Sequence, residues 1–157
     1  MENKEEFMRE AIRLSIEKMN AGHGGPFGAV VVRNGQIIAR GFNNVTSSND
    51  PTAHAEVDAI RKACAALGTH QLTDCELYTS CEPCPMCLGA IYWARPRKVY
   101  FGNTKHDAAQ AGFDDQFIYE ELVIPLQQRA IPMEQLLRSE ALTAFQEWQK
   151  KEDRMDY

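Results

Sequence analysis

His54-Ala55-Glu56 and Pro83-Cys84-Pro85-Met86-Cys87 are the two stretches that decide the fold, because each is predicted to open a helix. Together they supply one imidazole, two thiols and one further carboxylate. An imidazole with two thiolates is a usual catalytic ligand set for zinc, in which the fourth coordination position is left for water. Glu56 is close enough to reach that water without being a ligand, so it is the predicted catalytic proton carrier. The predicted ligands of a Zn²⁺ ion are His54, Cys84 and Cys87.

Other chemistries use similar cysteine spacings. Cys81, Cys84 and Cys87 form C-x-x-C-x-x-C, which begins a ferredoxin-type cluster motif, but the position of the required fourth cysteine holds Ile91. We therefore expect Cys81 to be an inert thiol at a strand end. A redox pair or two buried thiols remain alternatives for the C-x-x-C pair. A zinc-stabilised binding module is a further alternative, although structural zinc sites use four protein ligands and do not need Glu56.

The composition is that of an ordinary globular protein, with 44% hydrophobic and 25% charged residues. A length of 157 residues suits one domain, 1–157, with its own core. The net charge of −5 and the lack of a basic stretch argue against a nucleic-acid partner. Five cysteines, an odd number, are typical of a reducing compartment, and neither a signal peptide nor a membrane-spanning run is recognisable. We therefore expect a cytoplasmic protein with no membrane partner.

The hydrophobic pattern predicts a helix followed by a hairpin in the first third of the chain. Residues 5–20 carry apolar side chains at helical spacing. Residues 27–32 form the continuous apolar run that is typical of a strand covered on both faces. Asn34-Gly35 is a hairpin signal, which returns the chain as an antiparallel strand over 36–43. The polar residues 43–50 are expected to be a loop.

The two motifs come next, each at the start of a predicted helix. Asp50-Pro51-Thr52 has the composition of a helix start, Gly68 ends that helix, and Cys64 faces its core side. Pro85 suits the first turn of a second helix. Two strand–helix units after a hairpin favour an α/β sandwich with the two metal helices side by side. The other predicted elements are strands over 76–79, 98–102 and 130–137, a helix over 116–123, and a last helix from residue 139 with Leu142, Phe145 and Trp148 on its buried face.

Four stretches together resemble a known family. The H-x-E…P-C-x-x-C pattern is the signature of zinc nucleobase deaminases. Over nearly its full length the chain resembles the cytidine-deaminase-like superfamily, and within it the small bacterial guanine deaminases. The second and third stretches are shared with tRNA adenosine deaminases, so they indicate chemistry but not substrate. The stretches are Gly24-Gly25-Pro26-Phe27-Gly28-Ala29-Val30, Asn49-Asp50-Pro51-Thr52-Ala53-His54-Ala55-Glu56, Tyr78-Thr79-Ser80-Cys81-Glu82-Pro83-Cys84-Pro85-Met86-Cys87 and Ala111-Gly112-Phe113-Asp114-Asp115.

This resemblance implies a three-layer α/β/α sandwich around a five-stranded mixed sheet. It also implies a homodimer in which a C-terminal helix and lid segment, 139–157, crosses to the partner and closes its active site. The implied activity is the zinc-dependent hydrolysis of guanine to xanthine and ammonia, in purine catabolism or salvage. A deaminase of adenosine in tRNA, or of guanosine or another small base, is the alternative.

The resemblance also assigns roles in the site. Asp115 would be a second proton shuttle that contacts the purine, and Asn43 would hydrogen-bond the edge of the base. Tyr157 would belong to the lid. The other implied substrate contacts are Phe27, Ala55 and Trp93. Each role has a structural alternative, with Phe27 and Trp93 as core residues, Asp115 as a turn residue and Tyr157 as a loose chain end.

Overall fold

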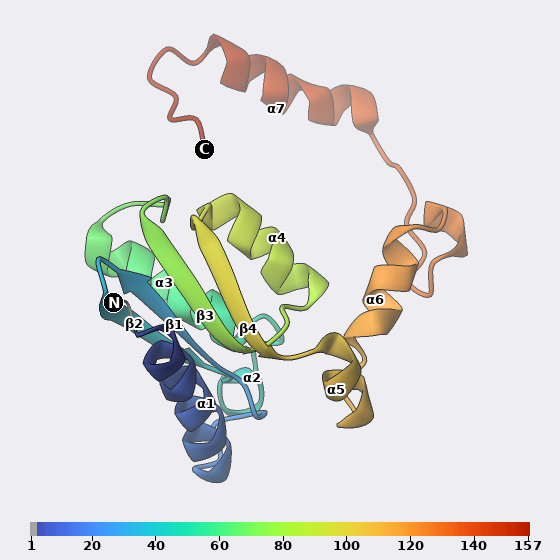
Figure 1. Ribbon diagram of the computed structural model, residues 1–157. Coiled ribbons are helices and arrows are strands. Elements are labelled where there is room, and N and C mark those ends of the chain that lie inside the picture. Colours follow the sequence, from blue (N-terminus) through green and yellow to red (C-terminus); the bar gives the residue numbers. More distant parts are fainter. Residues whose placement is uncertain (1–2) are drawn as a thin grey trace. The chain divides into compact units, whose positions relative to one another are not determined.

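A computed structural model describes residues 3–157, which fall into two compact units, 3–116 and 117–157. The first unit contains the sheet and both motifs, and the second contains helical segments (Figure 1). In the described range no helix combines the length and the apolar character needed to cross a membrane.

The sheet of the first unit is mixed and has the strand order β2-β1-β3-β4 (Figure 1). Strand β1 is antiparallel to both of its neighbours, and β3 is parallel to β4. A parallel pair requires a crossover, which helix α4 provides. The strands are β1 (Gly28–Arg33), β2 (Gln36–Phe42), β3 (Cys75–Cys81) and β4 (Lys98–Asn103).

The hairpin between β1 and β2 confirms the turn predicted at Asn34-Gly35. Both residues have positive φ, 51° and 73°, as a type I′ turn requires. Arg33 consequently pairs with Gln36 across the turn. The register places β1 inside the sheet, and its burial on both faces explains the continuous apolar run in the sequence.

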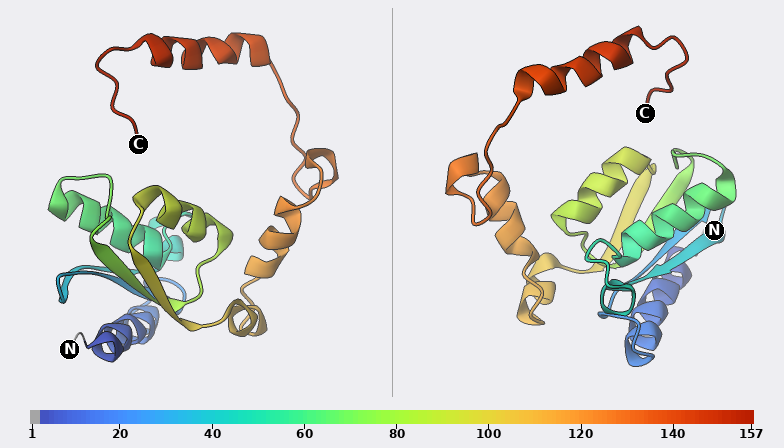
Figure 2. Two further views of the ribbon diagram at one scale, coloured as in Figure 1. Left: turned by 45° about the horizontal axis from the view of Figure 1, so that its top comes forward. Right: turned by 180° about the vertical axis from the view of Figure 1, so that it is seen from behind.

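Helices cover both faces of the sheet, which confirms the three-layer arrangement (Figure 2). Successive strand residues point to opposite faces, so each strand contributes to two cores. Val30, Val32 and Tyr78 pack with Leu14 beneath one helix, whereas Ala29, Val31 and Leu77 pack with residues of two others on the opposite face. These helices are α1 (Lys4–Asn20) on the first face, and α3 (Ala55–Leu67) and α4 (Pro85–Ala94) on the second.

The expectation of a fifth strand is wrong, because the described residues form a sheet of four strands. The sequence suggested a strand over 130–137, but residues 132–137 adopt neither helix nor strand. Pro132 has no N–H to donate to a strand ladder. Ile131 and Leu136 are 81% and 80% exposed, so the segment lacks a covered apolar face that would fix a strand register.

The first metal helix begins later than the proline pattern suggested. Residues Asp50 to Thr52 form a turn, in which the Asp50 carboxylate accepts hydrogen bonds from the Thr52 backbone N–H and hydroxyl at 2.8 and 2.7 Å. Such a local bond competes with helix formation. Helix α3 therefore starts at Ala55, with His54 in the N-cap position. A short helix, α2 (Val45–Ser48), lies in the stretch expected to be loop.

The remaining elements are helices. Thr104 and Asp107 form a capping box at the start of α5 (Lys105–Gln110). Helix α6 (Asp115–Leu122) matches the predicted helix over 116–123 to within a residue at each end. The second unit also contains a 3₁₀ turn, η1 (Leu126–Gln128), and α7 (Arg138–Lys150). The last helix is present as predicted, but in the single chain no residue of α7 is buried, so the buried face expected for it does not form within one chain.

Candidate active site

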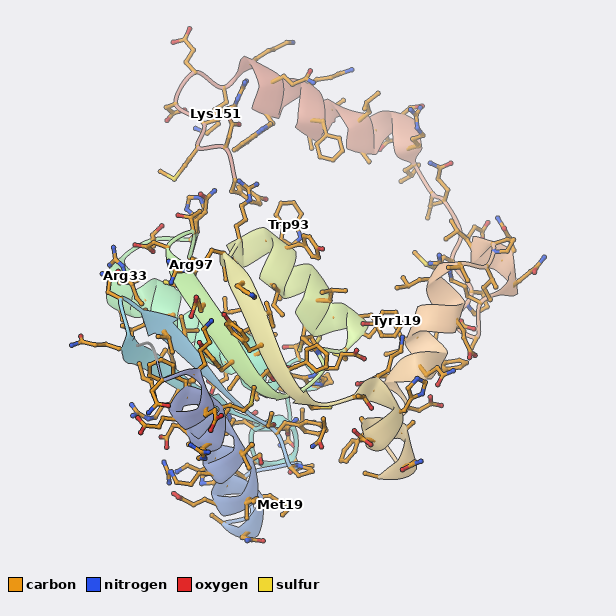
Figure 3. The ribbon with its side chains drawn as sticks, in the orientation of Figure 1. Met19, Arg33, Trp93, Arg97, Tyr119 and Lys151 are labelled. Carbon is orange, nitrogen blue, oxygen red and sulfur yellow. The ribbon has the colours of Figure 1, made fainter. Side chains whose placement is uncertain are left out.

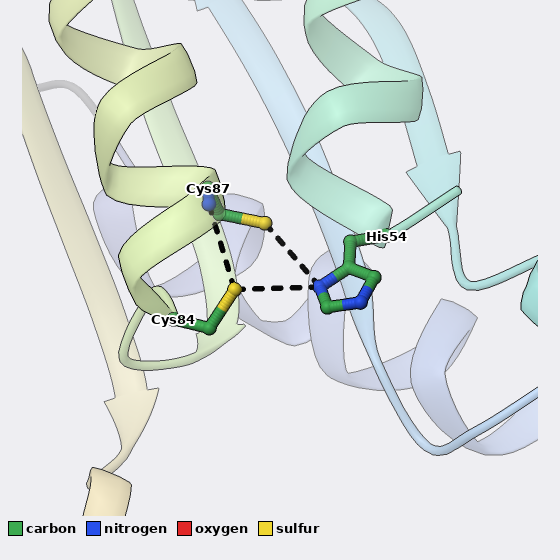
Figure 4. Close-up of side chains that lie close together, drawn as sticks. All are labelled: His54, Cys84 and Cys87. Atoms are coloured by element: carbon green, nitrogen blue, oxygen red, sulfur yellow. Dashed lines mark hydrogen bonds between the residues drawn. The ribbon is translucent and has the colours of Figure 1, made fainter. Parts of the chain in front are cut away.

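The starts of α3 and α4 bring the three predicted metal ligands together (Figure 4). The two helices pack against each other on one face of the sheet, so their first residues meet. His54 is the N-cap of α3, and Cys84 is the N-cap of α4, where Pro85 provides the first helical residue. Cys87 lies one turn into α4. Two short motifs thirty residues apart therefore meet because helix packing aligns their N-termini.

The separations of the donor atoms fit a zinc ion. The Nδ1 atom of His54 lies 3.5 Å from each of the Cys84 and Cys87 Sγ atoms, and all three donors lie within 4.8 Å of one another. With bonds of about 2.0 Å to nitrogen and about 2.3 Å to sulfur, a tetrahedral zinc ion separates these ligands by about 3.5 Å. The donor set matches zinc in chemistry as well as in spacing.

The three ligand side chains have shifted pKa values, and the shift at Cys84 favours metal binding. A hydrogen bond from Cys87, with another from His54, lowers the pKa of the Cys84 thiol to about 4. The Cys84 sulfur also accepts from the Cys87 backbone N–H at 3.5 Å. This thiolate in turn raises the pKa of His54, and it raises the pKa of Cys87, because only one thiol of the pair ionises readily. The second proton leaves when a cation is bound.

Glu56 is buried beside the ligand set. Its side chain is 5% exposed, and burial raises its pKa. This increase is larger than the decrease expected from the partial positive charge at the start of the helix. The Thr79 hydroxyl donates to Oε1 at 3.0 Å, while Oε2 lies 3.4 Å from the Cys87 sulfur. A buried carboxyl group with a raised pKa is suited to the role of a general acid/base.

A cavity of about 220 Å³ opens onto this cluster. Its lining contains six of the residues that the sequence singled out, and all of them belong to the first unit. Four further lining side chains had no predicted role, namely Val45, Thr46, Glu82 and Phe113. The six are Phe27, Asn43, His54, Glu56, Cys84 and Asp115.

Asn43 is held in one orientation by the backbone around it. Its Oδ1 accepts hydrogen bonds from the N–H groups of Gly25 and Val45, at 3.2 and 3.1 Å. Gly24 lies so close that a methyl group there would overlap the Asn43 side chain and backbone, which explains a glycine at this position. Since Oδ1 is engaged, the Nδ2 group remains to donate a hydrogen bond to a ligand in the cavity.

Aromatic and acidic side chains also line the cavity. Phe27 and Phe113 meet edge to face with ring centroids 4.9 Å apart. Burial, and after it the nearby Cys84 thiolate, raises the pKa of Asp115. The cavity thus combines apolar walls with a few polar groups, as small-molecule sites do. Phe113 lies in the Gly112-Phe113-Asp114-Asp115 stretch, so its position beside Asp115 was the signal from which it could have been found.

The other predicted contacts lie outside this lining. Ala55 is fully buried in the first turn of α3. Trp93 projects from the outer side of α4 and is 63% exposed (Figure 3). Tyr157 belongs to the second unit. Their roles in substrate binding stay predictions.

The remaining cysteines are not part of the metal cluster. Cys81 ends β3 and is buried, as expected. Burial is the main cause that raises the pKa values of Cys75 and Cys81 to about 11, and it also raises the pKa of Cys64, which packs against the core. These three thiols are therefore protonated and weakly reactive at neutral pH.

Comparison with known proteins identifies relatives over the whole chain. Guanine deaminase from Bacillus subtilis is 59% identical over 155 residues, which is 99% of each protein. The X-ray structure of guanine deaminase from that organism matches with a TM-score of 0.96 over 99% of both chains. A tRNA-specific adenosine deaminase from Agrobacterium fabrum is 42% identical over 71% of this chain and 74% of its own length.

A structure solved in complex with 2,6-diaminopurine is 37% identical, with a TM-score of 0.70, over 73% of this chain and 64% of that one. The family model for the cytidine and deoxycytidylate deaminase zinc-binding region matches residues 1–103, which include His54, Cys84 and Cys87. The match spans the ligand cluster, Glu56 and the whole four-stranded sheet. The chain belongs to the cytidine and deoxycytidylate deaminase family of zinc-binding domains.

Proposed function

We propose that this protein hydrolyses guanine to xanthine and ammonia. The observation that carries the proposal is the 59% identity to a guanine deaminase over 99% of both chains. The tRNA-specific relative matches over only 71% of this chain. The cavity, which holds a zinc ligand set, a buried carboxyl group and aromatic walls, has the chemistry that this reaction needs.

The metal ligands, the aromatic side chains and Asn43 have separate roles in the proposed reaction. His54, Cys84 and Cys87 would hold zinc. When bound, the ion supplies Lewis acidity, which lowers the pKa of water from about 15.7 to near 7. Phe27 and Phe113 form one apolar wall against which the base would pack and from which bulk water is excluded. The Nδ2 group of Asn43 donates to an acceptor on the purine edge.

Glu56 moves the protons. Its carboxylate takes a proton from the attacking water and delivers it to N3 of guanine as the oxygen adds to C2. Glu56 then takes the remaining proton from the new hydroxyl group on C2 and passes it, with help from Asp115, to the 2-amino nitrogen. The C2–N bond breaks, ammonia leaves and the C2 carbonyl of xanthine forms. A positioned general acid/base of this kind contributes about 10²–10⁴-fold in rate.

Asp115 also provides selectivity. Its carboxylate faces the cavity, where it can accept hydrogen bonds from the N–H donors of guanine. Adenine presents an acceptor at N1 where guanine presents a donor, so it would leave the half-buried Asp115 carboxylate unpaired. Sites built to accept from a substrate N–H reject analogues that lack it by about 10⁴–10⁵-fold.

We further propose a homodimer in which 139–157 crosses to the partner and Tyr157 closes its site. Apolar side chains that are exposed in the single chain support this, among them Phe145 on α7, Met155, and Tyr92 and Trp93 on α4, at 69%, 71%, 74% and 63%. Deleting residues 154–157 should raise the KM for guanine and leave the zinc content unchanged. Unchanged kinetics after the deletion would contradict the role of this segment as a lid. A monomer of the full chain in light scattering would contradict the dimer.

A cytoplasmic location fits the same chemistry. Zinc binding needs Cys84 and Cys87 as reduced thiolates, and an oxidising compartment would favour their disulfide. Fractionation of cells that produce the protein, with cytoplasmic and exported markers, checks this location.

The decisive experiment measures xanthine formation from guanine by absorbance, with zinc quantified in the same sample. Turnover should require about one zinc per chain, stop after complete chelation and return when zinc is restored. Full activity of metal-free protein would refute the mechanism. The panel should include adenine, guanosine, cytosine and a tRNA substrate at two salt concentrations, because binding to RNA weakens steeply with salt. Activity on tRNA but not on guanine would favour the tRNA deaminase alternative.

A further inference from the structure

Thr79 is a buried polar residue next to the catalytic carboxyl group. It lies on β3 and is 1% exposed. Its hydroxyl donates to Glu56 Oε1 at 3.0 Å and is also 3.2 Å from the carbonyl oxygen of Cys81. A buried hydroxyl without partners would be costly, and here both partners belong to the region of the site. The sequence offered no signal for this contact, because Thr79 and Glu56 lie on different elements.

The hydroxyl has one hydrogen but two acceptors within reach. It can donate to the Glu56 carboxylate or to the Cys81 carbonyl oxygen, and not to both at once. When Glu56 carries a proton, the Thr79 oxygen can accept from it while the hydroxyl hydrogen turns to Cys81. Thr79 can therefore remain hydrogen-bonded to Glu56 in both forms that the proton carrier passes through.

The contact also leaves the second oxygen of Glu56 in place for chemistry. With Oε1 held by Thr79, Oε2 lies 3.4 Å from the Cys87 sulfur and so faces the ligand set. Rotation of the carboxyl group would move Oε2 away from the ligand set. Misplacement of a reacting group by about 1 Å can cost roughly 10²-fold in rate.

We propose that Thr79 is a positioning residue for Glu56, whose hydroxyl fixes the carboxyl group in its working orientation. The inference rests on the proposed deamination and on the role of Glu56 in it. Thr79 does not contact the cavity, and it acts only through Glu56. It therefore belongs to the support of the proton carrier and not to the substrate site.

The test compares Thr79→Val, which keeps the shape and removes the hydroxyl, with Thr79→Ser, which keeps the hydroxyl. Thr79→Val should lower kcat by about 10–100-fold, as the loss of such a supporting hydrogen bond does. The KM for guanine should change little, because an interaction that matters in the transition state lowers kcat and kcat/KM equally. Thr79→Ser should restore most of kcat. Both variants should keep about one zinc per chain.

Ser80→Ala is the matched control. Ser80 is the next residue of β3, is 4% exposed and accepts from the Gly28 backbone N–H at 3.0 Å. Neighbouring strand residues point to opposite faces, so this variant removes a buried hydrogen bond without touching Glu56. It should lower the melting temperature and leave kcat unchanged. If Thr79→Val is insoluble, Thr79→Ala removes the same hydroxyl with a smaller side chain.

Several results would overturn the inference. They are a kcat of Thr79→Val within twofold of wild type, a loss of kcat explained by lost zinc, or a soluble Thr79→Ser variant as slow as Thr79→Val. A crystal structure of Thr79→Val gives a readout independent of activity, in which Glu56 should adopt a different side-chain torsion. If wild type makes no xanthine, the proposed function fails. In that case, comparison of the Glu56 side-chain torsion in crystal structures of wild type and Thr79→Val still decides whether Thr79 positions that side chain.

Discussion

Glu56 is the residue on which the proposed chemistry depends most directly. Glu56→Gln keeps the size and burial of the side chain but can no longer exchange a proton. We expect the variant to retain zinc, because Glu56 is not among the three clustered donors, and to lose about 10²–10⁴-fold or more in kcat. Metal analysis and xanthine absorbance on the same sample check this. Substantial turnover with zinc bound would mean that another group carries the proton.

At this scale the sequence predicted ligands better than it predicted their surroundings. His54, Cys84 and Cys87 follow from motif spacing, because few chemistries use that donor set. Thr79 and Phe113 could not be assigned in the same way. Their importance comes from contacts with Glu56 and Phe27, which are distant in the chain. The local pattern gives no signal for Thr79, and for Phe113 it gives only the position beside Asp115.

At the scale of elements, the site depends on how closely α3 packs on β2. Gly41 is buried where a methyl group would overlap the Ala55 carbonyl oxygen and the Ala59 amide nitrogen. Gly41→Ala should push the start of α3 outward and destabilise the protein by about 1–3 kcal/mol. Because His54 caps that helix, zinc affinity should fall as well. Urea unfolding and a zinc competition assay measure the two effects.

Gly89 in α4 is the control for this prediction, because an added methyl group there has no atom within 4 Å. Gly89→Ala should stabilise the protein by about 0.5–1 kcal/mol, since alanine loses less backbone entropy in a helix. Zinc affinity should not change. A destabilised Gly89→Ala variant, or a Gly41→Ala variant with normal stability and zinc affinity, would contradict this account of the packing.

The helix and strand boundaries also show where sequence patterns are reliable. Asn34-Gly35, Gly68 and Pro85 mark a turn, a helix end and a helix start correctly, because each acts through its own backbone preference. The start of α3 was misplaced, because the Asp50 side chain bonds to Thr52 and closes a turn before the helix begins. The residue at which the helix starts therefore depends on competition between this side-chain hydrogen bond and the backbone hydrogen bonds of a helix.

For the whole molecule, acid stability should reflect an ion cluster that joins α1 to β2. Glu10 accepts from Arg13 of its own helix and, at 2.7 Å, from Arg40 of β2. Chiefly through the hydrogen bond from Arg13, these guanidinium groups lower the pKa of Glu10 from 4.5 to about 2. The stabilisation is therefore fully present above the ordinary pKa and is lost as the pH falls from about 4.5 toward 2.

Glu10→Gln tests this prediction directly. The variant should be less stable than wild type at pH 7, by a constant difference down to about pH 5. The difference in urea midpoint should close between about pH 4.5 and 2, where wild-type Glu10 becomes protonated. Since the two arginine side chains are about half exposed, added salt should also shrink the difference. A difference independent of both pH and salt would point to packing as the cause.

The sequence by itself determined the zinc donor set, the hairpin, and the order of the four strands and of the three helices that cover their sheet. These features depend on ligand chemistry, hydrophobic period and the backbone preferences of a few neighbouring residues. Only the tertiary structure decided that the sheet has four strands and that the Thr79 hydroxyl donates a hydrogen bond to Glu56. It also decided that Asn43 is locked by the glycine loop. Those outcomes depend on which segments pack against the sheet and on contacts between residues far apart in the chain. No local sequence pattern encodes such contacts.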